Sequence, residues 1–494
     1  MSRATGLLLS IFLCLVSAAP AKDEHAPTKA VVAASSPALI SIRRDLIGRI
    51  EGGELPSMSI GVAQDDQVLW LEGLGWADRE ARTGATPDTV YAVASVSKSL
   101  TATVAATLVA RGRMRWEDEV STGLPGVAPS ITLEELFDQT SGLPHLWWYE
   151  YRDAPESALR RAQILEAARA VAFQPGQGFL YSNLNPEIAA QHIERVLAEP
   201  FERIAERELF VPVGMTHTAT ERWVGRDSTA AGYNKKGRVR FSYRLRPRGG
   251  AGFFSSARDL LRYAQFHLGT LLRGPSLISP AHLVEMHGDG TPAGARGYAF
   301  GWGRLELEGH DVVLISDGEM LGATAAVMIV PTRKLAIVLL TNTNADMLEH
   351  ASAIADAVVS GFGKRLADGA HSLEARWSTA ASMPTGSWSG ALQLGSAEIK
   401  VTMDFDTRPS PTIRLGDGLL RTLDNLEWDR GLLNAKVAGS FPLPSDEGRS
   451  HDLELVLHLS GSTIDGFAVD SLAADSDHHR YGFPYAMHLR RQGQ

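Results

Sequence analysis

The spacing of hydrophobic residues changes from a helical to a strand period early in this chain. In residues 37–50, leucine and isoleucine recur every three or four positions, which predicts an amphipathic helix. Residues 58–63 and 67–72 are mostly apolar runs on either side of a pair of aspartates, a pattern typical of two strands joined by a turn. From there to about residue 363 helices dominate, with glycine-rich loops between them.

Strand-like runs return toward the end of this helical region. Residues 311–316, 323–331 and 334–341 are predicted to form three neighbouring antiparallel strands, and residues 347–365 a final helix. Because strands occur at both ends with helices between them, we predict an α/β (α+β) domain over residues 37–366. Its single sheet would be built from both ends of the segment.

The composition changes after residue 366. Residues 367–384 are predicted to be a linker, and the residues that follow lack a helical period. Instead, every second position is apolar in residues 399–405 and 453–459, which is the pattern of strands. Residues 385–494 are therefore predicted to form a separate all-β domain, either a sandwich or a barrel.

The N-terminal segment predicts export. Residues 1–21 combine Arg3, an apolar stretch and the small residues Ala19 and Ala21 at a cleavage site, as secretory signals do. Residues 22–36 are mostly small and polar and are predicted to be a flexible leader. Cys14, the one cysteine, lies in the signal, so the mature protein would have no disulfide. We expect a bacterial periplasmic or secreted protein.

Size and charge narrow the classes of function. A chain of 494 residues that is 44% hydrophobic can hold more than one domain and bury a large core. A net charge of −9 without a basic cluster argues against a nucleic-acid or anionic-membrane partner. The apolar stretch of the signal is too short for stable membrane insertion. The sequence contains no His-Glu-x-x-His, Gly-x-Ser-x-Gly, phosphate-loop or dinucleotide motif, so neither a metal nor an organic cofactor is predicted.

One segment carries a candidate nucleophile. Residues 91–100 read YAVASVSKSL, which places Ser95 three residues before Lys98 at the start of an apolar helix. Residues three apart lie on the same helical face, and a desolvated lysine can lose its proton and act as a base. A serine needs such a base before it attacks an acyl group. The alternative is a helix-capping serine beside a solvated lysine, but the apolar run that follows favours burial.

A second proton carrier is predicted at Tyr181. Residues 173–185 read FQPGQGFLYSNLN, which indicates a turn, a short extended piece and then a helix. Tyr181 and Asn183 are two residues apart, so in an extended segment their side chains would point the same way, toward the serine. The alternative is a packed loop tyrosine followed by a capping asparagine.

Together, the Ser95-x-x-Lys98 and Tyr181-x-Asn183 pairs resemble motifs of the serine β-lactamase and penicillin-binding protein superfamily, especially its class C β-lactamase and family VIII esterase-like branch. The resemblance covers roughly residues 37–365. It includes segments without chemistry of their own, among them GLGWAD at 73–78, TSGLP at 140–144, PVGM at 212–215, GWG at 301–303 and LLTN at 339–342. It implies a β-lactamase-like antiparallel sheet with a helical domain.

The resemblance also implies a role for each residue. Ser95 would be the acylated nucleophile, and Lys98 would help to deprotonate it. Tyr181 would act as general base and later activate the deacylating water, its phenol kept acidic by positive charge nearby. Asn183 would hold the amide or acyl side chain of the substrate. How Lys98 and Tyr181 share the role of base stays open.

The third motif of the superfamily, Lys-Thr-Gly or His-x-Gly, is replaced here by Ser316-Asp317-Gly318. Gly318 still permits close approach of the backbone, and the N–H groups of Ser95 and Glu319 would form the oxyanion hole. Ser316 takes the place of the cationic or imidazole residue that helps to receive a substrate carboxylate. Asp317 and Glu319 add negative charge, which disfavours an anionic substrate end.

These residues predict an exported serine hydrolase that cleaves a small ester, or an amide or peptide without a free carboxylate, through an acyl-serine intermediate. A β-lactamase or D-amino-acid peptidase acting on peptidoglycan-type substrates is the first alternative. Arg246 and Arg248 are candidates for the carboxylate clamp that it would need, unless they are solvent-facing loop arginines. The second alternative is a binding or regulatory homologue without turnover. The natural substrate and the oligomeric state stay open.

Overall fold

The structure is a computed structural model, and it describes residues 27–120, 130–145, 170–220, 228–235, 237–239, 249–272, 276–289, 297–378, 383–394, 397–439, 451–472 and 484–492. The predicted signal, Arg246 and Arg248 lie outside these residues. No helix in the described ranges is long and apolar enough to span a membrane.

The central feature is an antiparallel sheet ordered β1-β3-β2-β13-β12-β11-β10-β9, with β4 paired to β3. Its strands are β1 (Thr28–Val32), β2 (Ser57–Gln64), β3 (Gln67–Asp78), β4 (Thr83–Gly84), β9 (Tyr298–Ala299), β10 (Trp302–Glu306), β11 (Val312–Met320), β12 (Ala323–Val330) and β13 (Leu335–Thr341). β2 pairs with β13, so Met58 lies opposite Thr341. The predicted sheet from both ends of the domain is confirmed.

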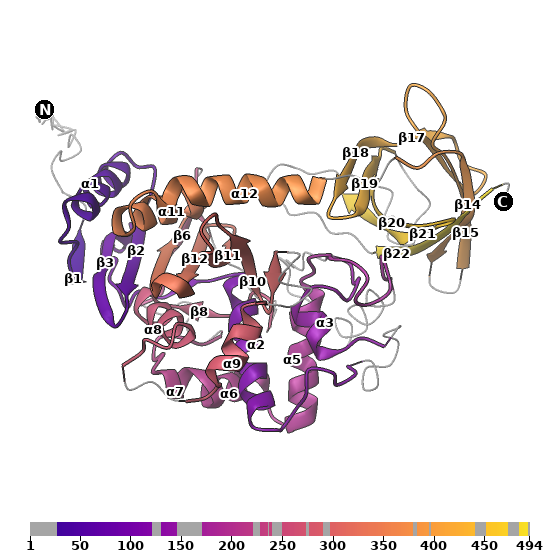
Figure 1. Cartoon of the computed structure of the whole chain (residues 1–494). Helices are drawn as coiled ribbons and strands as arrows, with labels where there is room; N and C mark the ends of the chain where they lie inside the picture. The colour runs from indigo at the N-terminus through magenta and orange to yellow at the C-terminus, as the bar shows by residue number, and fades with distance from the viewer. Residues whose placement is uncertain are drawn as a thin grey trace, which may run out of the picture.

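Helices cover both faces of this sheet (Figure 1). One hydrophobic core packs α1 (Pro37–Glu51), α11 (Met347–Val358) and the start of α12 (Phe362–Ser378) on one face. A second core packs α2 (Val96–Ala110), α5 (Leu184–Leu197) and α8 (Ala257–His267) on the other. The remaining elements of this domain are β5 (Tyr91–Ala92), α3 (Leu133–Phe137), α6 (Phe201–Ala205), the π-helix η2 (Glu206–Phe210), α7 (Val211–Val213), β6 (Gly232–Asn234), β7 (Gly237–Val239), β8 (Phe254–Ser255), α9 (Pro280–Met286) and the 3-10 helix η4 (Pro331–Arg333).

Two local predictions differ from the structure. Residues 28–32, expected in a flexible leader, form β1 and pair antiparallel with β3. Residues 347–365, expected as one helix, are divided between α11 and α12 at Gly361, whose φ of +76° is left-handed. Glycine adopts that conformation without steric cost, so the chain can turn there.

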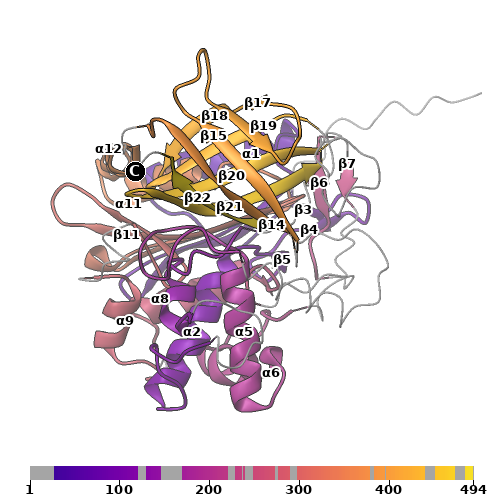
Figure 2. The same cartoon turned by 90° about the vertical axis from the view of Figure 1, so that its right-hand side faces the viewer.

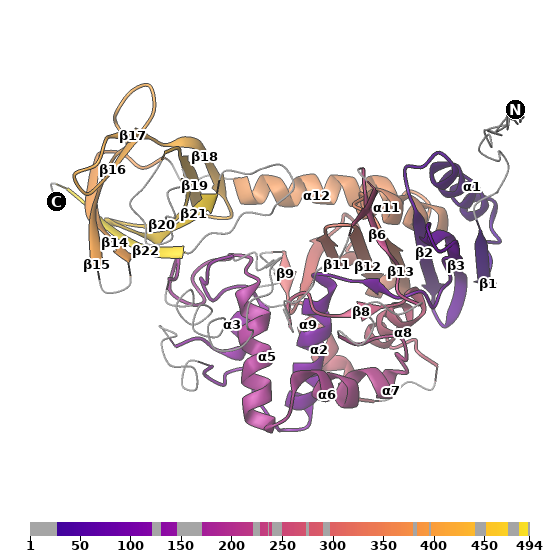
Figure 3. The ribbon, with the colours of Figure 1, turned by 180° about the vertical axis from the view of Figure 1, so that it is seen from behind.

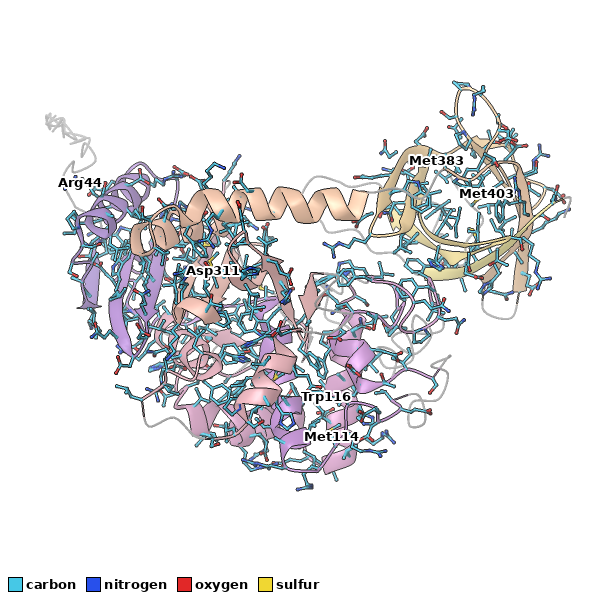
Figure 4. The ribbon with its side chains drawn as sticks, viewed as in Figure 1. Arg44, Met114, Trp116, Asp311, Met383 and Met403 are labelled. Atoms are coloured by element: carbon cyan, nitrogen blue, oxygen red, sulfur yellow. The ribbon has the colours of Figure 1, made fainter. Side chains whose placement is uncertain are left out.

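The helix α12 connects the two domains. It extends to Ser378, within the range expected to be a linker (367–384), and runs from the sheet to the C-terminal domain (Figure 1). Its residue Arg365 pairs with the buried Asp311, which also accepts a hydrogen bond from Arg333 at 3.0 Å (Figure 4). Burial opposes the charge of Asp311, but these hydrogen bonds lower its pKa to about 2. This ionic cluster fixes the first turn of α12 against the sheet.

The C-terminal domain is a nearly closed barrel ordered β17-β16-β15-β14-β22-β21-β20-β19-β18. Its strands are β14 (Ser387–Leu394), β15 (Ala397–Asp404), β16 (Thr412–Leu415), β17 (Arg421–Thr422), β18 (Asp424–Asp429), β19 (Leu432–Val437), β20 (His451–Ser460), β21 (Thr463–Leu472) and β22 (Pro484–Arg491). Apolar residues of the alternating segments face inward, since Val401, Met403 and Leu455 are buried in the core of the barrel. Figure 4 labels Met403 in this domain. A β domain was predicted, and of its two forms the structure is a barrel.

The barrel lies beside the part of the first domain that contains α5 (Figures 2 and 3), and α3 lies next to α5 there (Figure 3). Phe173 of the first domain joins Leu432 and Phe467 of the barrel in one buried hydrophobic cluster. The ring of Phe173 also contacts that of His458, with centroids 5.7 Å apart. The barrel therefore supports the segment that leads to Tyr181.

Candidate active site

Ser95 lies in a turn that exposes its hydroxyl group. Ala94, directly before it, has a left-handed φ of +45°, and Ser95 itself begins α2 with φ −66° and ψ −10°. The Ser95 side chain makes no helix-capping hydrogen bond. A non-glycine residue in the left-handed region is uncommon and typical of functional turns. The hydroxyl is therefore presented to its neighbours on α2 and in the loop before α5 rather than to its own helix.

Lys98 is buried one turn along α2 and contacts the serine. Its Nζ lies 2.8 Å from Ser95 Oγ and donates to the carbonyl of Gly250 at 3.2 Å. Its side chain is 2% exposed. Burial lowers the pKa of Lys98 to about 7, although the charges of Glu187 and Asp317 act in the opposite direction. Near neutral pH a large share of this amine is therefore unprotonated and able to accept a proton.

Tyr181 reaches the same serine from the loop before α5. Its OH lies 3.0 Å from Ser95 Oγ, and Lys98 Nζ lies over its ring, 4.7 Å from the centroid. Burial and the charge of Asp317 raise the pKa of Tyr181. The sequence argument expected an acidic phenol, and the direction is the opposite one. Burial is the larger of these two effects, because it disfavours the charged phenolate.

The loop before α5 holds Tyr181 in place through Gln139. The side-chain Oε1 of Gln139 accepts hydrogen bonds from the backbone N of Ser182 and from Nδ2 of Asn185, both at 2.7 Å. Its backbone carbonyl accepts from the N of Leu180 at 2.9 Å. These contacts fix the backbone on both sides of the tyrosine.

His145 lies beside Tyr181 and was missed by the sequence argument. The two rings are 5.5 Å apart, and burial together with the charge of Lys98 lowers the pKa of His145 to about 4. Its neutral ring therefore adds no charge to the site. The signal that could have found it is its position directly after the TSGLP segment.

Glu187 and the pair Gly249–Gly250 form the support of Lys98. Glu187 is buried on α5, and its Oε1 accepts a hydrogen bond from the N of Gly250 at 3.0 Å. A Cβ at Gly249 would lie 2.1 Å from the carbonyl O of Pro186, so only glycine fits there. Gly250 therefore links Glu187 to Lys98, because its backbone N–H donates to Glu187 and its carbonyl accepts from the amine of Lys98.

The third motif lies on β11 beside the nucleophile. A Cβ on Gly318 would lie 2.5 Å from the backbone N of Ser95, so the strand touches the turn there. Ser316 points the same way and donates to Ser99 Oγ at 3.0 Å. β11 pairs with β10 only as far as Ile315. After Ile315, this edge of β11 is no longer paired with β10 and faces α2 instead.

Asn183 is placed differently from the expectation. With φ −71° and ψ −18° it already has helical geometry and begins α5, so the argument from an extended segment does not apply. Of the predicted substrate-binding residues, Ser316, Asp317 and Glu319 line the active-site pocket, whereas Asn183 is not among the described residues that do.

These groups open into one pocket with a volume of about 730 Å³. Its lining includes Ser95 and Tyr181 together with apolar residues of α11 and α12, such as Met347 and Leu366. Two lining residues that the sequence argument did not consider are Tyr298, whose ring is 6.2 Å from that of Tyr181, and Arg430 of the barrel. Among the described residues, no cluster of His, Cys, Asp or Glu is suited to hold a metal ion.

Known proteins resemble this chain over the region that carries the site. The model of a family described as Beta-lactamase matches residues 42–359. Protein flp of Staphylococcus aureus (strain N315) is 24% identical over 322 residues, which are 61% of this chain and 63% of that protein. The chain therefore spans less than two thirds of Protein flp. A beta-lactamase of Pseudomonas fluorescens is 25% identical over 346 residues, 62% of this chain and 94% of that enzyme.

Solved structures show the same fold. The octameric penicillin-binding protein homologue from Pyrococcus abyssi has a TM-score of 0.59 at 18% identity, covering 91% of this chain and all of that one. The Beta-Lactamase/D-Alanine Carboxypeptidase from Pseudomonas syringae has a TM-score of 0.56 at 18% identity, covering 66% of this chain and 99% of that one.

Proposed function

This chain belongs to the beta-lactamase family, and from that premise we propose that it hydrolyses an ester or amide bond through an acyl-Ser95 intermediate. One observation carries the proposal. Ser95 Oγ lies within hydrogen-bonding distance of both Lys98 Nζ and Tyr181 OH, at 2.8 and 3.0 Å, and Ser95 lines a pocket large enough for a small substrate. A nucleophile, a base and a proton donor converge there.

The pKa values divide the proton transfers between the two partners. The neutral amine of Lys98 takes the proton of Ser95 as Oγ attacks the acyl carbon. The protonated phenol of Tyr181 gives its proton to the leaving group, which departs as an alcohol or amine. The N–H groups of Ser95 and Glu319 are the proposed oxyanion donors, supported by the contact of β11 with the turn of Ser95. Water then attacks the acyl-serine and gives a proton to the phenolate of Tyr181, while the ammonium of Lys98 returns its proton to the departing Ser95 Oγ, which releases the acid and restores all three groups.

Charge around the pocket favours an ester, or an amide that carries no carboxylate next to the scissile bond. Asp317 and Glu319 line the wall on the side of β11, where an anionic group would meet two negative charges. A β-lactamase or D-amino-acid peptidase is the second candidate, supported by the fold that the chain shares with a structure described as a D-alanine carboxypeptidase. In either case we propose a bacterial protein exported to the periplasm or secreted, on the basis of residues 1–21.

The test uses three reagents on the purified protein and on Ser95→Ala. These are a short-chain p-nitrophenyl ester, a chromogenic cephalosporin and a fluorophosphonate probe. Ester turnover and probe labelling that are both lost in Ser95→Ala would support the proposal, and turnover of the cephalosporin would support the second candidate. Labelling that survives in Ser95→Ala would reject Ser95 as the nucleophile. No labelling and no turnover by the unmodified protein would indicate a homologue without catalysis.

A further inference from the structure

We infer that an apolar hollow between the central sheet and the helices α11 and α12 binds the acyl chain of the substrate, so that Ser95 is acylated best by uncharged acyl groups of about eight carbons. This hollow is part of the pocket that Ser95 lines. The inference rests on the proposed function, because it concerns which acyl groups Ser95 accepts. It names the class of ester that the site selects.

The pocket of Ser95 extends around an edge of β11. Successive residues of a strand point to opposite faces of its sheet. Ser316 donates to Ser99 of α2, so Asp317 points to the other face, which α11 and α12 cover. Both Ser316 and Asp317 line the same pocket. Because β10 pairs with β11 only as far as Ile315, it does not close this edge. The space of about 730 Å³ therefore reaches both faces of the sheet.

On the face covered by α11 and α12, the lining of the pocket is mainly apolar. Ile315 on β11 lies opposite Met328 on β12, and both belong to or pack against the hydrophobic core of that face. Met347 of α11 and Leu366 of α12 line the space from the side of the helices. Ala370 follows Leu366 by one helical turn, and its short side chain leaves room between α12 and the sheet. Such a wall favours a hydrocarbon chain over water.

The proposed reaction determines which part of a substrate occupies this hollow. In the intermediate the acyl carbon is bonded to Ser95 Oγ, so the acyl chain stays in the pocket after the leaving group has departed. Asp317 and Glu319 line the pocket on β11, and their charges would repel an acyl chain that ends in a carboxylate. An uncharged hydrocarbon chain meets no such repulsion.

The volume of the pocket suits an acyl chain of this length. A methylene group takes up about as much space as a water molecule in the liquid, roughly 30 Å³. An octanoyl chain would therefore fill roughly a third of the 730 Å³ and leave space for the alcohol part of the ester. Burying one methylene group gives about a fourfold gain in binding. We therefore expect kcat/KM to rise with the length of the acyl chain.

The p-nitrophenyl esters of acetic, butyric and octanoic acid test this inference. In the unmodified protein, kcat/KM should rise at least about tenfold from acetate to octanoate. Ala370→Phe fills part of the hollow and should lower the octanoate-to-acetate ratio at least about tenfold, because two or more methylene groups lose their place. Ala370→Val is a smaller change and should lower the ratio less. Ala367→Phe, at an exposed position of α12 outside the described lining, is the matched control and should leave the ratio unchanged.

The outcomes separate this inference from the proposed function. If the ratio is the same in both Ala370 variants as in the unmodified protein, or if kcat/KM of the unmodified protein does not rise from acetate to octanoate, the acyl-chain site is overturned and the proposed function stands. An equal loss with all three esters in both variants would also overturn it, because it would indicate a role of Ala370 in folding. If the unmodified protein turns over none of the esters and the fluorophosphonate does not label Ser95, the proposed function fails, and this inference fails with it.

Discussion

The charge of Glu187 is expected to set the pH range in which Lys98 can act as a base. Replacing Glu187 by glutamine removes this charge while keeping an amide oxygen that can accept the hydrogen bond from the N of Gly250, now 3.0 Å long. The carboxylate raises the pKa of Lys98 against the larger effect of burial. In Glu187→Gln the pKa of Lys98 should therefore fall below its value of about 7.

The size of the shift follows from the geometry around Gly250. Its N lies 3.0 Å from Glu187 Oε1, and its O lies 3.2 Å from Lys98 Nζ. With roughly 3 Å between the N and O of one residue, the two charges are at most about 9 Å apart. At an effective dielectric constant of about 20, their attraction is worth about 2 kcal/mol. Since about 1.4 kcal/mol corresponds to one pKa unit, the pKa of Lys98 should fall by at least about one unit.

The assay is the pH dependence of kcat/KM for a neutral p-nitrophenyl ester, whose rising limb reports the pKa of the base in the free enzyme. We expect a midpoint near 7 in the unmodified protein and a midpoint about one unit lower in Glu187→Gln. At pH 6, kcat/KM of Glu187→Gln should therefore be a larger fraction of its own plateau value than in the unmodified protein. Each profile is normalised to that plateau, because a less basic amine also lowers the maximal rate.

Glu194 provides the matched control for this variant. It lies on the same helix and likewise accepts a backbone hydrogen bond, from the N of Phe201 at 2.9 Å. Glu194→Gln should leave the midpoint where it is. An unchanged or raised midpoint in Glu187→Gln, or a midpoint near 10 in the unmodified protein, would refute the assignment of Lys98 as the base.

Four further variants test other parts of the site, and one of them is a control. Tyr181→Phe keeps the ring under Lys98 but removes the OH that is 3.0 Å from Ser95. The kcat should therefore fall by about 10²–10⁴, while the midpoint of the pH profile near 7 persists. If the rising limb of the pH profile is lost instead, the phenol is the base. Gly318→Ala places a Cβ 2.5 Å from the N of Ser95. Turnover, measured by kinetics, should therefore fall at least about tenfold, and the free energy of unfolding, measured by denaturation, should fall by about 1–3 kcal/mol. Gly303→Ala, where a Cβ would be 3.4 Å from the nearest atom, should be tolerated. Asp317→Asn removes a charge that raises the pKa of Lys98, so the midpoint of the pH profile should fall. An unchanged midpoint would contradict this coupling between Asp317 and Lys98.

Local patterns were sufficient wherever the relevant contacts are local. Ser95 and Lys98 are one helical turn apart, so their contact follows from spacing once the helix is known. The inward-facing residues of the barrel follow in the same way from the period of two. The break at Gly361 was missed because apolar residues keep a helical spacing on both sides of it. Strand β1 was missed because its residues are nearly all exposed and show no alternation.

Contacts between segments that are far apart in the chain could not be predicted from local sequence patterns. The Asp429-Arg430-Gly431 turn is recognisable as a hairpin, but nothing in its composition shows that it docks on Phe179. The direction of the Tyr181 pKa also depends on the tertiary structure, since it follows from burial by segments far apart in the chain. Asn183 was expected in the extended piece, but it is the residue directly before α5 and already has helical backbone geometry.

The opposite pKa shifts of Lys98 and Tyr181 have one physical origin, and that origin explains how the site can work. Burial disfavours whichever form of a group is charged, so it moves a lysine toward the neutral amine and a tyrosine toward the neutral phenol. Near pH 7 the same desolvated pocket therefore contains a base and an acid on either side of Ser95. The segment that carries Tyr181 is packed against the barrel through Phe173. The second domain thus helps to maintain the burial on which this division of roles depends.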